Sequence, residues 1–123
     1  MHLGMRIEMA AEGMADRPAL GRRSEARPFA ELADRVRRVG AWLHTTPGEH
    51  VVLVDLNSEA VPLALFGAAL AAKPFVPINY RLTDDQLRAL LVRTAPATVI
   101  VGDGVAERLG SIDGVELLER DEF

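Results

Sequence analysis

The feature of this sequence that most constrains its fold is a valine-rich run followed directly by an apolar helical segment. Residues 51–56 read Val-Val-Leu-Val-Asp-Leu, which is the pattern of a strand covered on both faces. Residues 59–72, with Pro62 in the first turn, are apolar on almost every side. We therefore expect a helix that is buried against a sheet and against a further element.

The segments that follow repeat this alternation of strand and helix. Thr83 and Gln86 form a capping box, which predicts a helix start, and Leu87, Leu90 and Leu91 form its inward face. We predict, in chain order, a strand at 75–78, a helix at 83–94, a strand at 97–101, a short helix at 105–109 and a strand at 115–118. This order predicts an α/β fold with an open, mostly parallel sheet, right-handed crossovers and flanking helices.

The first part of the chain is predicted to add two helices and a short edge strand. Apolar residues at helical spacing predict a helix over the first dozen residues, ending near Gly13. Pro18 is expected to open the edge strand. An amphipathic helix should run from Phe29 and end before Pro47, with Arg35, Arg37 and Arg38 on a solvated face. Residues 1–123 are thus expected to form a single α/β unit.

Composition excludes several classes of function. The chain has 14 Lys and Arg against 18 Asp and Glu, a net charge of -4 that disfavours binding to nucleic acid or to an anionic membrane. It has no cysteine, and His2, His44 and His50 lack the spacing of metal ligands. No segment has the length of a membrane span or the core of a signal peptide, so we expect a cytoplasmic protein.

Candidate ligand-binding positions lie where the predicted strands end, because ligands of open α/β sheets bind outside the carboxyl ends of the strands. After Leu56, the residues Asn57 and Ser58 are best interpreted as a helix cap, and Ser58 is the better candidate. After Val101, residues 102–104 read Gly-Asp-Gly, but the rest of a phosphate-binding motif is absent, so a plain turn is favoured.

Arg81, which follows the strand that ends at Ile78, is the most informative of these positions. Its guanidinium could bind a phosphate or a carboxylate through its fork of donors, although residue chemistry by itself favours a solvated loop cation. His44 and His50 have no nucleophile nearby, so no triad or carboxylate dyad is indicated. We expect no catalytic residue and no metal ligand, and hence an incomplete catalytic site.

Three segments are similar to those of one known family. Residues 15–20 look like an opening strand, Phe29-Ala30-Glu31-Leu32 resembles the first core motif, and residues 65–83 resemble the second core motif with its loop. From about Asp16 to Val101 the chain resembles the N-terminal part of the AMP-forming acyl-CoA synthetases, in the adenylate-forming AMP-binding family. Two residues depart from the pattern: Pro28 replaces a capping Ser or Thr, and Lys73 replaces a glycine.

This resemblance implies a two-step reaction for the complete enzyme. A small carboxylic acid attacks ATP in the presence of Mg²⁺ to give an acyl-adenylate, and coenzyme A then takes the acyl group as a thioester. The phosphate loop, the adenine and ribose motifs, the metal-binding Glu and the C-terminal Lys of the family have no counterparts here. The chain is therefore expected to be the N-terminal fragment of a larger AMP-binding domain, inactive by itself and binding none of these ligands tightly.

The resemblance also suggests one site residue and two kinds of partner. The arginine at the position of Arg81 can contact the nucleotide phosphate of coenzyme A in relatives that use this coenzyme. The partner would be the remainder of the synthetase chain or a second copy of this chain. The alternatives are a free-standing interaction or dimerisation module derived from the fold, and a small nucleotide-binding α/β domain of another kind.

Overall fold

The structure is a computed structural model that describes residues 2–22, 24–56 and 58–123. Its elements, in chain order, are α1 (Leu3–Gly13), β1 (Pro18–Leu20), β2 (Arg27–Pro28), α2 (Phe29–Thr45), β3 (His50–Val54), α3 (Ala60–Leu70), β4 (Phe75–Pro77), α4 (Asp84–Thr94), β5 (Ala97–Val101), α5 (Val105–Leu109), β6 (Val115–Glu119) and a 3-10 turn, η1 (Arg120–Glu122). The predicted order of helices and strands is confirmed. The short pairing strand β2 was not predicted.

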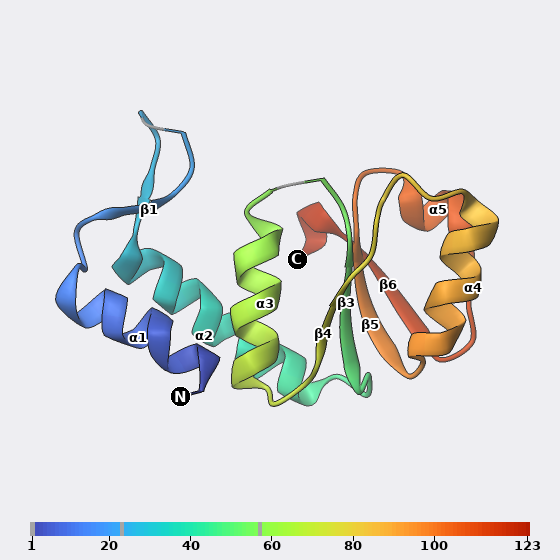
Figure 1. Ribbon diagram of the computed structural model, residues 1–123, viewed down its shortest axis with the longest axis horizontal. Helices are drawn as coiled ribbons and strands as arrows, with labels where there is room; N and C mark the ends of the chain where they lie inside the picture. Colours follow the sequence, from blue (N-terminus) through green and yellow to red (C-terminus); the bar gives the residue numbers. More distant parts are fainter. Residues whose placement is uncertain (1, 23, 57) are drawn as a thin grey trace.

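The main sheet has four parallel strands in the order β4-β3-β5-β6, and β1 and β2 form a separate antiparallel pair. Helices α1, α2 and α3 lie on one side of the main sheet, while α4 and α5 lie on the other (Figure 1). The predicted α/β class, with an open parallel sheet and flanking helices, is therefore confirmed.

Strand β3 shows why the valine-rich run must be apolar throughout. Val51 and Leu53 pack into a core with α2 and α3, whereas Val52 and Val54 pack into a second core with α4 and α5. All four side chains are at most 4% exposed. Alternate residues of a strand point to opposite faces, so a strand between two helical layers has no polar face.

The further element that covers α3 is α2, together with α1. The two helices approach closely at glycines: a Cβ atom at Gly67 would lie 2.5 Å from Val39 Cγ1, and one at Gly40 would lie 2.9 Å from Leu70 Cβ. These separations are shorter than van der Waals contact, so a side chain at either position would push the helices apart. The composition of α3, apolar on all sides, matches this double burial.

The differences from the prediction include one strand boundary and the burial of one leucine. Strand β3 ends at Val54 rather than Leu56, because Asp55 turns into a polar cluster and Leu56 is 53% exposed. On α4, Leu87 and Leu91 are fully buried, but Leu90 is only partly covered because it lies at the margin of the helix face that contacts the sheet. The predicted capping box of Thr83 and Gln86 is confirmed in both directions.

The two departures from the family pattern have local compensations. Pro28 provides no side-chain cap for α2, but the carbonyls of Arg17 and Ala15 accept hydrogen bonds from the N–H groups of Phe29 and Ala30, at 3.0 and 3.1 Å. The Lys73 ammonium donates to the carbonyls of Leu43 and Thr46, at 2.5 and 2.9 Å. Lys73 thereby satisfies carbonyl groups at the C-terminal end of α2, where cations are favoured.

The left-handed residue at this turn is Ala72, with φ of 56°, and not Lys73. A non-glycine residue in this region costs about 1 kcal/mol or more. The turn therefore still contains a left-handed residue, the conformation that favours glycine. This residue is at position 72, one before position 73, where Lys73 replaces the glycine of the family.

The predicted solvated arginine face of α2 is confirmed for Arg37 and Arg38, which are exposed, whereas Arg35 is only partly exposed. Arg37 donates two hydrogen bonds to Glu8 of α1, at 2.8 and 2.7 Å, and Arg35 donates to Glu59 at 3.2 Å. Arg38 pairs with Asp34 within the same helix and is 70% exposed. Arg35 and Arg37 differ from Arg38 because the fold places carboxylates of distant segments opposite them.

No described helix is long and apolar enough to cross a membrane.

Candidate functional site

The topology defines one crevice in this sheet. Strands β3 and β5 are neighbours, but β3 leads into α3 on one face while β5 leads into α5 on the other (Figure 1). Because the two connections diverge, a gap opens between the carboxyl ends of β3 and β5, and such gaps are where open α/β sheets bind ligands. In this chain the gap is a pocket of about 240 Å³.

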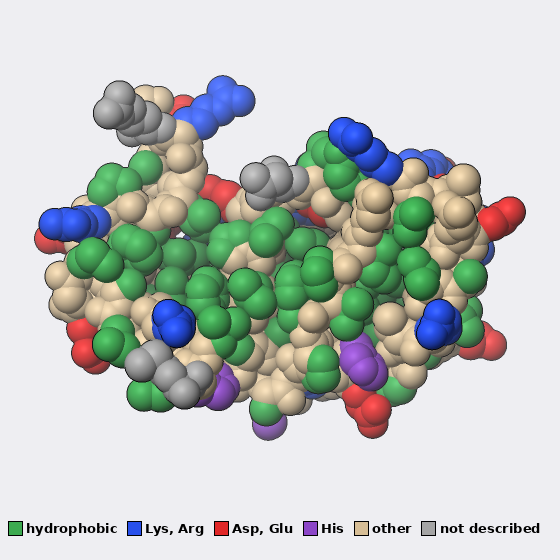
Figure 2. Space-filling view, viewed as in Figure 1, with side chains coloured by type: hydrophobic (Ala, Val, Ile, Leu, Met, Phe, Trp, Pro, Cys, Tyr) green, Lys and Arg blue, Asp and Glu red, His purple; other side chains and the backbone are tan. Residues whose placement is uncertain are grey.

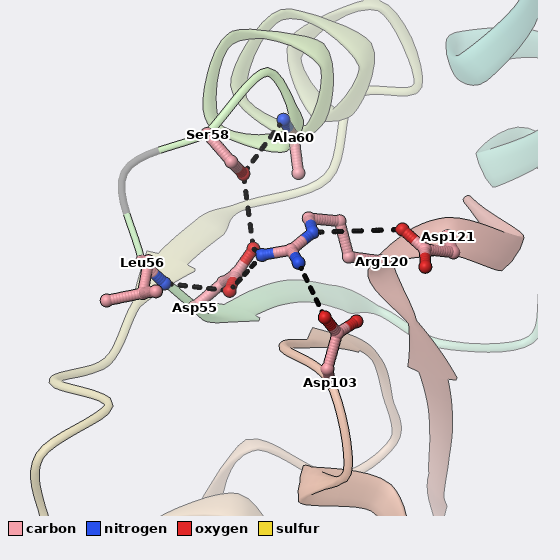
Figure 3. Close-up of polar contacts among 7 residues, drawn as sticks. All are labelled: Asp55, Leu56, Ser58, Ala60, Asp103, Arg120 and Asp121. Atoms are coloured by element: carbon pink, nitrogen blue, oxygen red, sulfur yellow. Dashed lines mark hydrogen bonds and ion pairs between the residues drawn. The ribbon is translucent and has the colours of Figure 1, made fainter.

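Asp55 occupies the floor of this pocket directly after β3. Its side chain is 2% exposed. Its carboxylate accepts hydrogen bonds from the Leu56 N–H at 2.8 Å and from the Ser58 hydroxyl at 3.1 Å (Figure 3). A buried carboxylate needs such donors because it has lost its hydration. Asp55 is thus an anchored negative charge at the topological switch point.

Arg120, the first residue after β6, neutralises this charge. Its Nη1 lies 2.9 and 3.0 Å from the two oxygens of Asp55, and its Nη2 lies 3.1 Å from the Asp103 carboxylate (Figure 3). The hydrogen bond to Asp55, and then the charge of the same carboxylate, raise the pKa of the Arg120 guanidinium above its ordinary value. Arg120 therefore links the ends of β3, β5 and β6 as a permanent cation.

The Gly-Asp-Gly segment after β5 is a turn, as predicted, but Gly102 has a second role. A Cβ atom at Gly102 would lie 2.6 Å from Asp55 Oδ1, so a side chain there would displace the carboxylate. Gly104, which directly precedes α5, has φ of 77°, a left-handed conformation that glycine adopts readily. Asp103, between the two glycines, accepts a hydrogen bond from the other terminal nitrogen of Arg120.

The predicted cap after β3 is confirmed in part for Ser58: the N-cap position of α3 is Glu59, whose side chain makes no cap hydrogen bond, and Ser58 lies one residue before it. The Ser58 hydroxyl accepts a hydrogen bond from the Ala60 N–H at 3.2 Å, at the first turn of α3, while it donates to Asp55. The other candidate, Asn57, lies outside the described residues. Ser58 therefore connects the start of α3 to the buried carboxylate.

Arg81 lies beside this crevice but not in its lining. Its backbone N–H donates to the side chain of Asn79 at 2.9 Å, and its Nε donates to the Tyr80 hydroxyl at 3.2 Å. The guanidinium carbon stands 5.6 Å from the centre of the Tyr80 ring, within cation-π range. Tyr80 itself lines the crevice. Within residues 2–22, 24–56 and 58–123, no group bonds to the terminal nitrogens of Arg81.

The donor set of the crevice does not fit Mg²⁺ or a triphosphate. Asp55 and Asp103 are both engaged by Arg120, and the described residues contain no cluster of three or more metal-binding side chains. Oxygen ligands that are already paired with a guanidinium are poor ligands for a hard cation. No chemistry of ATP or Mg²⁺ is therefore assigned to these residues.

Sequence reasoning selected the ends of β3, β4 and β5 but missed Arg120, which joins two of them. The sequence contained the signal that was missed, because Arg120 lies two residues after the end of the predicted strand at 115–118. The same rule about carboxyl ends, applied to the fourth strand, identifies it. What the sequence could not show was that Asp55, 65 positions earlier, would be its partner.

The architecture defines the class of protein first. A four-stranded parallel sheet flanked by helices, in this connectivity, matches the N-terminal subdomain of adenylate-forming enzymes. The family model described as AMP-binding enzyme matches residues 7–122. This chain belongs to that AMP-binding family.

Similar proteins include both coenzyme A ligases and peptide synthetases. A benzoate CoA ligase from Burkholderia xenovorans LB400 superposes with a TM-score of 0.80 at 23% identity, covering 97% of this chain and 26% of that chain. A nonribosomal peptide synthetase, FmoA3, bound to α-methyl-L-serine-AMP, has a TM-score of 0.80 at 25% identity, covering 100% of this chain and 14% of that chain.

A curated relative is N-(5-amino-5-carboxypentanoyl)-L-cysteinyl-D-valine synthase from Amycolatopsis lactamdurans, which is 29% identical over 119 residues. The alignment covers 92% of this chain and 3% of the synthase. The chain thus spans a small part of the proteins it resembles, and these similarities do not distinguish the two kinds of enzyme.

Proposed function

We propose that this chain is the N-terminal portion of an ATP-dependent, AMP-forming acyl-CoA synthetase. The complete enzyme would convert a carboxylic acid to an acyl-adenylate and then to an acyl-CoA thioester, with ATP, Mg²⁺ and coenzyme A. The observation that carries this proposal is the family match over residues 7–122. The free guanidinium fork of Arg81 supports the choice of coenzyme A as the acyl acceptor, because such a fork suits a phosphate.

In this proposal the chain forms one α/β unit whose role is mainly to build the fold. The two acids that line its crevice, Asp55 and Asp103, are paired with Arg120, so neither is free for general acid-base or nucleophilic chemistry. We therefore expect the purified chain to be inactive. ATP-pyrophosphate exchange with a panel of aromatic, fatty and amino acids should give no rate above that of buffer, and clear turnover with any of them would refute the prediction.

Arg81 is proposed to contact the nucleotide phosphate of coenzyme A. Removing one exposed charge-assisted contact should weaken binding about fivefold, or about 1 kcal/mol. NMR titrations of the chain with coenzyme A and with dephospho-coenzyme A would measure this. Arg81→Ala should lower affinity for coenzyme A, whereas Arg93→Ala, which removes an exposed arginine of α4, should not.

The outcomes of this titration are separable. Equal affinity of the wild-type chain for coenzyme A and dephospho-coenzyme A would show that the phosphate is not recognised here. A phosphate preference that survives Arg81→Ala would assign the contact to another residue.

The second candidate is an adenylation domain of a peptide synthetase, favoured by the similarity to FmoA3 and to the Amycolatopsis synthase. Such a domain would pass its acyl group to a carrier protein rather than to free coenzyme A. A chain that ignores coenzyme A but shifts its NMR signals with a loaded carrier protein would favour this candidate.

A further inference from the structure

The loop between β4 and α4 fixes the backbone of Arg81 on both sides. The Ile78 N–H donates to the Leu53 carbonyl of β3 at 2.9 Å, and the Leu82 N–H donates back to the Asn79 carbonyl at 3.3 Å. Ile78 and Leu82 also pack into the core that contains α4 and α5. Between them, the Asn79 side chain accepts the Arg81 N–H at 2.9 Å, a local hydrogen bond by which Asn stabilises a turn. The starting point of the Arg81 side chain is therefore anchored.

Tyr80 holds the side chain of the same arginine. The Tyr80 hydroxyl accepts a hydrogen bond from Arg81 Nε at 3.2 Å, and the guanidinium carbon lies 5.6 Å from the centre of the ring. An arginine side chain has several rotatable bonds, and fixing them on binding a ligand costs free energy. Two contacts from a neighbouring ring reduce this cost before a ligand binds.

The hydrogen bond to Tyr80 also determines which edge of the guanidinium is open. A guanidinium can bind two oxygens of one phosphate through Nε and one terminal nitrogen, or through its two terminal nitrogens. In Arg81 the Nε–H is already used by Tyr80. The two terminal nitrogens accept no such partner from the part of the chain that the structure describes, so they form the open edge.

The charge of Arg81 is not neutralised by the acids that follow it in α4. Asp84 pairs with Arg108 at 2.8 Å, and Asp85 pairs with Arg88 at 3.1 Å. Among the described residues, no carboxylate lies within ion-pair distance of Arg81. Its open edge therefore carries a positive charge that suits an anion with two adjacent oxygens.

We propose that Tyr80 is a positioning residue, which fixes the Arg81 guanidinium so that its two terminal nitrogens bind two oxygens of one phosphate monoester. The phosphate then binds beside the crevice that the Tyr80 ring lines. This inference rests on the function proposed above, in which the monoester is the nucleotide phosphate of coenzyme A. It adds that Tyr80 contributes to phosphate affinity only through Arg81.

Tyr80→Phe tests the hydrogen bond, because it removes the acceptor and keeps the ring. In NMR titrations, affinity for coenzyme A should fall about twofold to threefold, the effect of one exposed polar contact. Affinity for dephospho-coenzyme A, which lacks the monoester, should not change. The Nε–H signal of Arg81 should also exchange faster with water in Tyr80→Phe, whereas the Nε–H signal of Arg93, an exposed arginine of α4, should not. An unchanged exchange rate at Arg81 would overturn the proposal.

A double-mutant cycle shows whether Tyr80 acts through Arg81 or by itself. A positioning residue has no effect once the residue that it positions is gone. Adding Tyr80→Phe to Arg81→Ala should therefore cause no further loss of affinity for coenzyme A. A further loss in the double variant would overturn the proposal, because Tyr80 would then contact the phosphate directly.

The same titrations separate this inference from the proposed function. If the wild-type chain binds coenzyme A and dephospho-coenzyme A equally, the Arg81 contact is wrong and the role of Tyr80 with it. If the preference for coenzyme A is lost in Arg81→Ala but unchanged in Tyr80→Phe, the Arg81 contact stands and only the role of Tyr80 is wrong.

Discussion

Asp55 shows how one buried charge can organise several strand ends. Its carboxylate receives one backbone N–H, one hydroxyl and two contacts from a single guanidinium nitrogen. Gly102 must lack a side chain because the carboxylate occupies that space. The cluster therefore explains three residue types, Asp, Gly and Arg, at three separate positions of the sequence, by one electrostatic requirement.

Removing Arg120 should destabilise the fold through Asp55. Arg120→Ala leaves a carboxylate that is 2% exposed without its cation. Breaking a buried pair costs about 3 kcal/mol or more, and the 27% exposure of Arg120 reduces our expectation to about 2 kcal/mol. Urea unfolding should show this loss, with a smaller one for Arg120→Lys, which keeps the charge but loses the planar fork.

A double-mutant cycle of Asp55→Asn and Arg120→Ala separates this coupling from other losses. The double variant should be less destabilised than the sum of the two single variants. Arg93→Ala serves as the surface control. Additive effects would contradict the assignment of Arg120 as the partner of Asp55.

At the scale of elements, ion pairs hold the helical layer of α1, α2 and α3 together at its solvent margin. Glu8 of α1 binds Arg37 of α2, and the hydrogen bond from Arg37 holds the pKa of Glu8 below its ordinary value of 4.5. Burial opposes the charge of Glu59, but Arg35 and Arg27 outweigh it and lower the pKa of this carboxyl too. Both carboxylates are thus more favourable as anions in the folded chain.

These pairs predict a loss of stability in acid. A carboxyl group whose pKa is lowered by folding contributes its full stabilisation above pH 4.5, and loses it as the pH falls through the lower native pKa. Unfolding midpoints measured from pH 7 downwards should therefore be steady to about pH 5 and then decline. Glu8→Gln should make the decline shallower, and Glu12→Gln, at an exposed position of the same helix, should leave it unchanged. An identical slope for wild type and Glu8→Gln would contradict the assignment.

At the scale of the whole molecule, the main features are the distribution of hydrophobic side chains on the surface and the outer strands of the sheet. Figure 2 shows hydrophobic side chains gathered over the middle of one face, across α3 and β4, with charged residues mostly at the periphery. Of the two outer strands of the main sheet, β4 contains Pro77 and β6 contains no proline. The inactivity expected in pyrophosphate exchange belongs to this scale, because the acids Asp55 and Asp103 that line the crevice are paired with Arg120, which holds the strand ends together.

Much of the fold could be predicted because its signals are local. The alternation of strand and helix, the capping box at Thr83 and the double burial of residues 51–54 follow from periodicity and hydrogen-bonding rules that act over a few residues. The candidate positions at the strand ends followed from topology in the same way. The predictions for the ends of β3 and for the burial of Leu90 were less accurate, because both features depend on neighbours outside the segment.

The sequence by itself determined the class of fold, the order of elements and the position of Arg81 after β4. The tertiary structure alone decided that Arg120 meets Asp55, that Arg37 meets Glu8, and that Lys73 closes the end of α2. The physical reason is that hydrophobic periodicity is a property of residues close together in the sequence. An ion pair, in contrast, depends on the distance between side chains that are far apart in the chain. That distance exists only once the layers have packed.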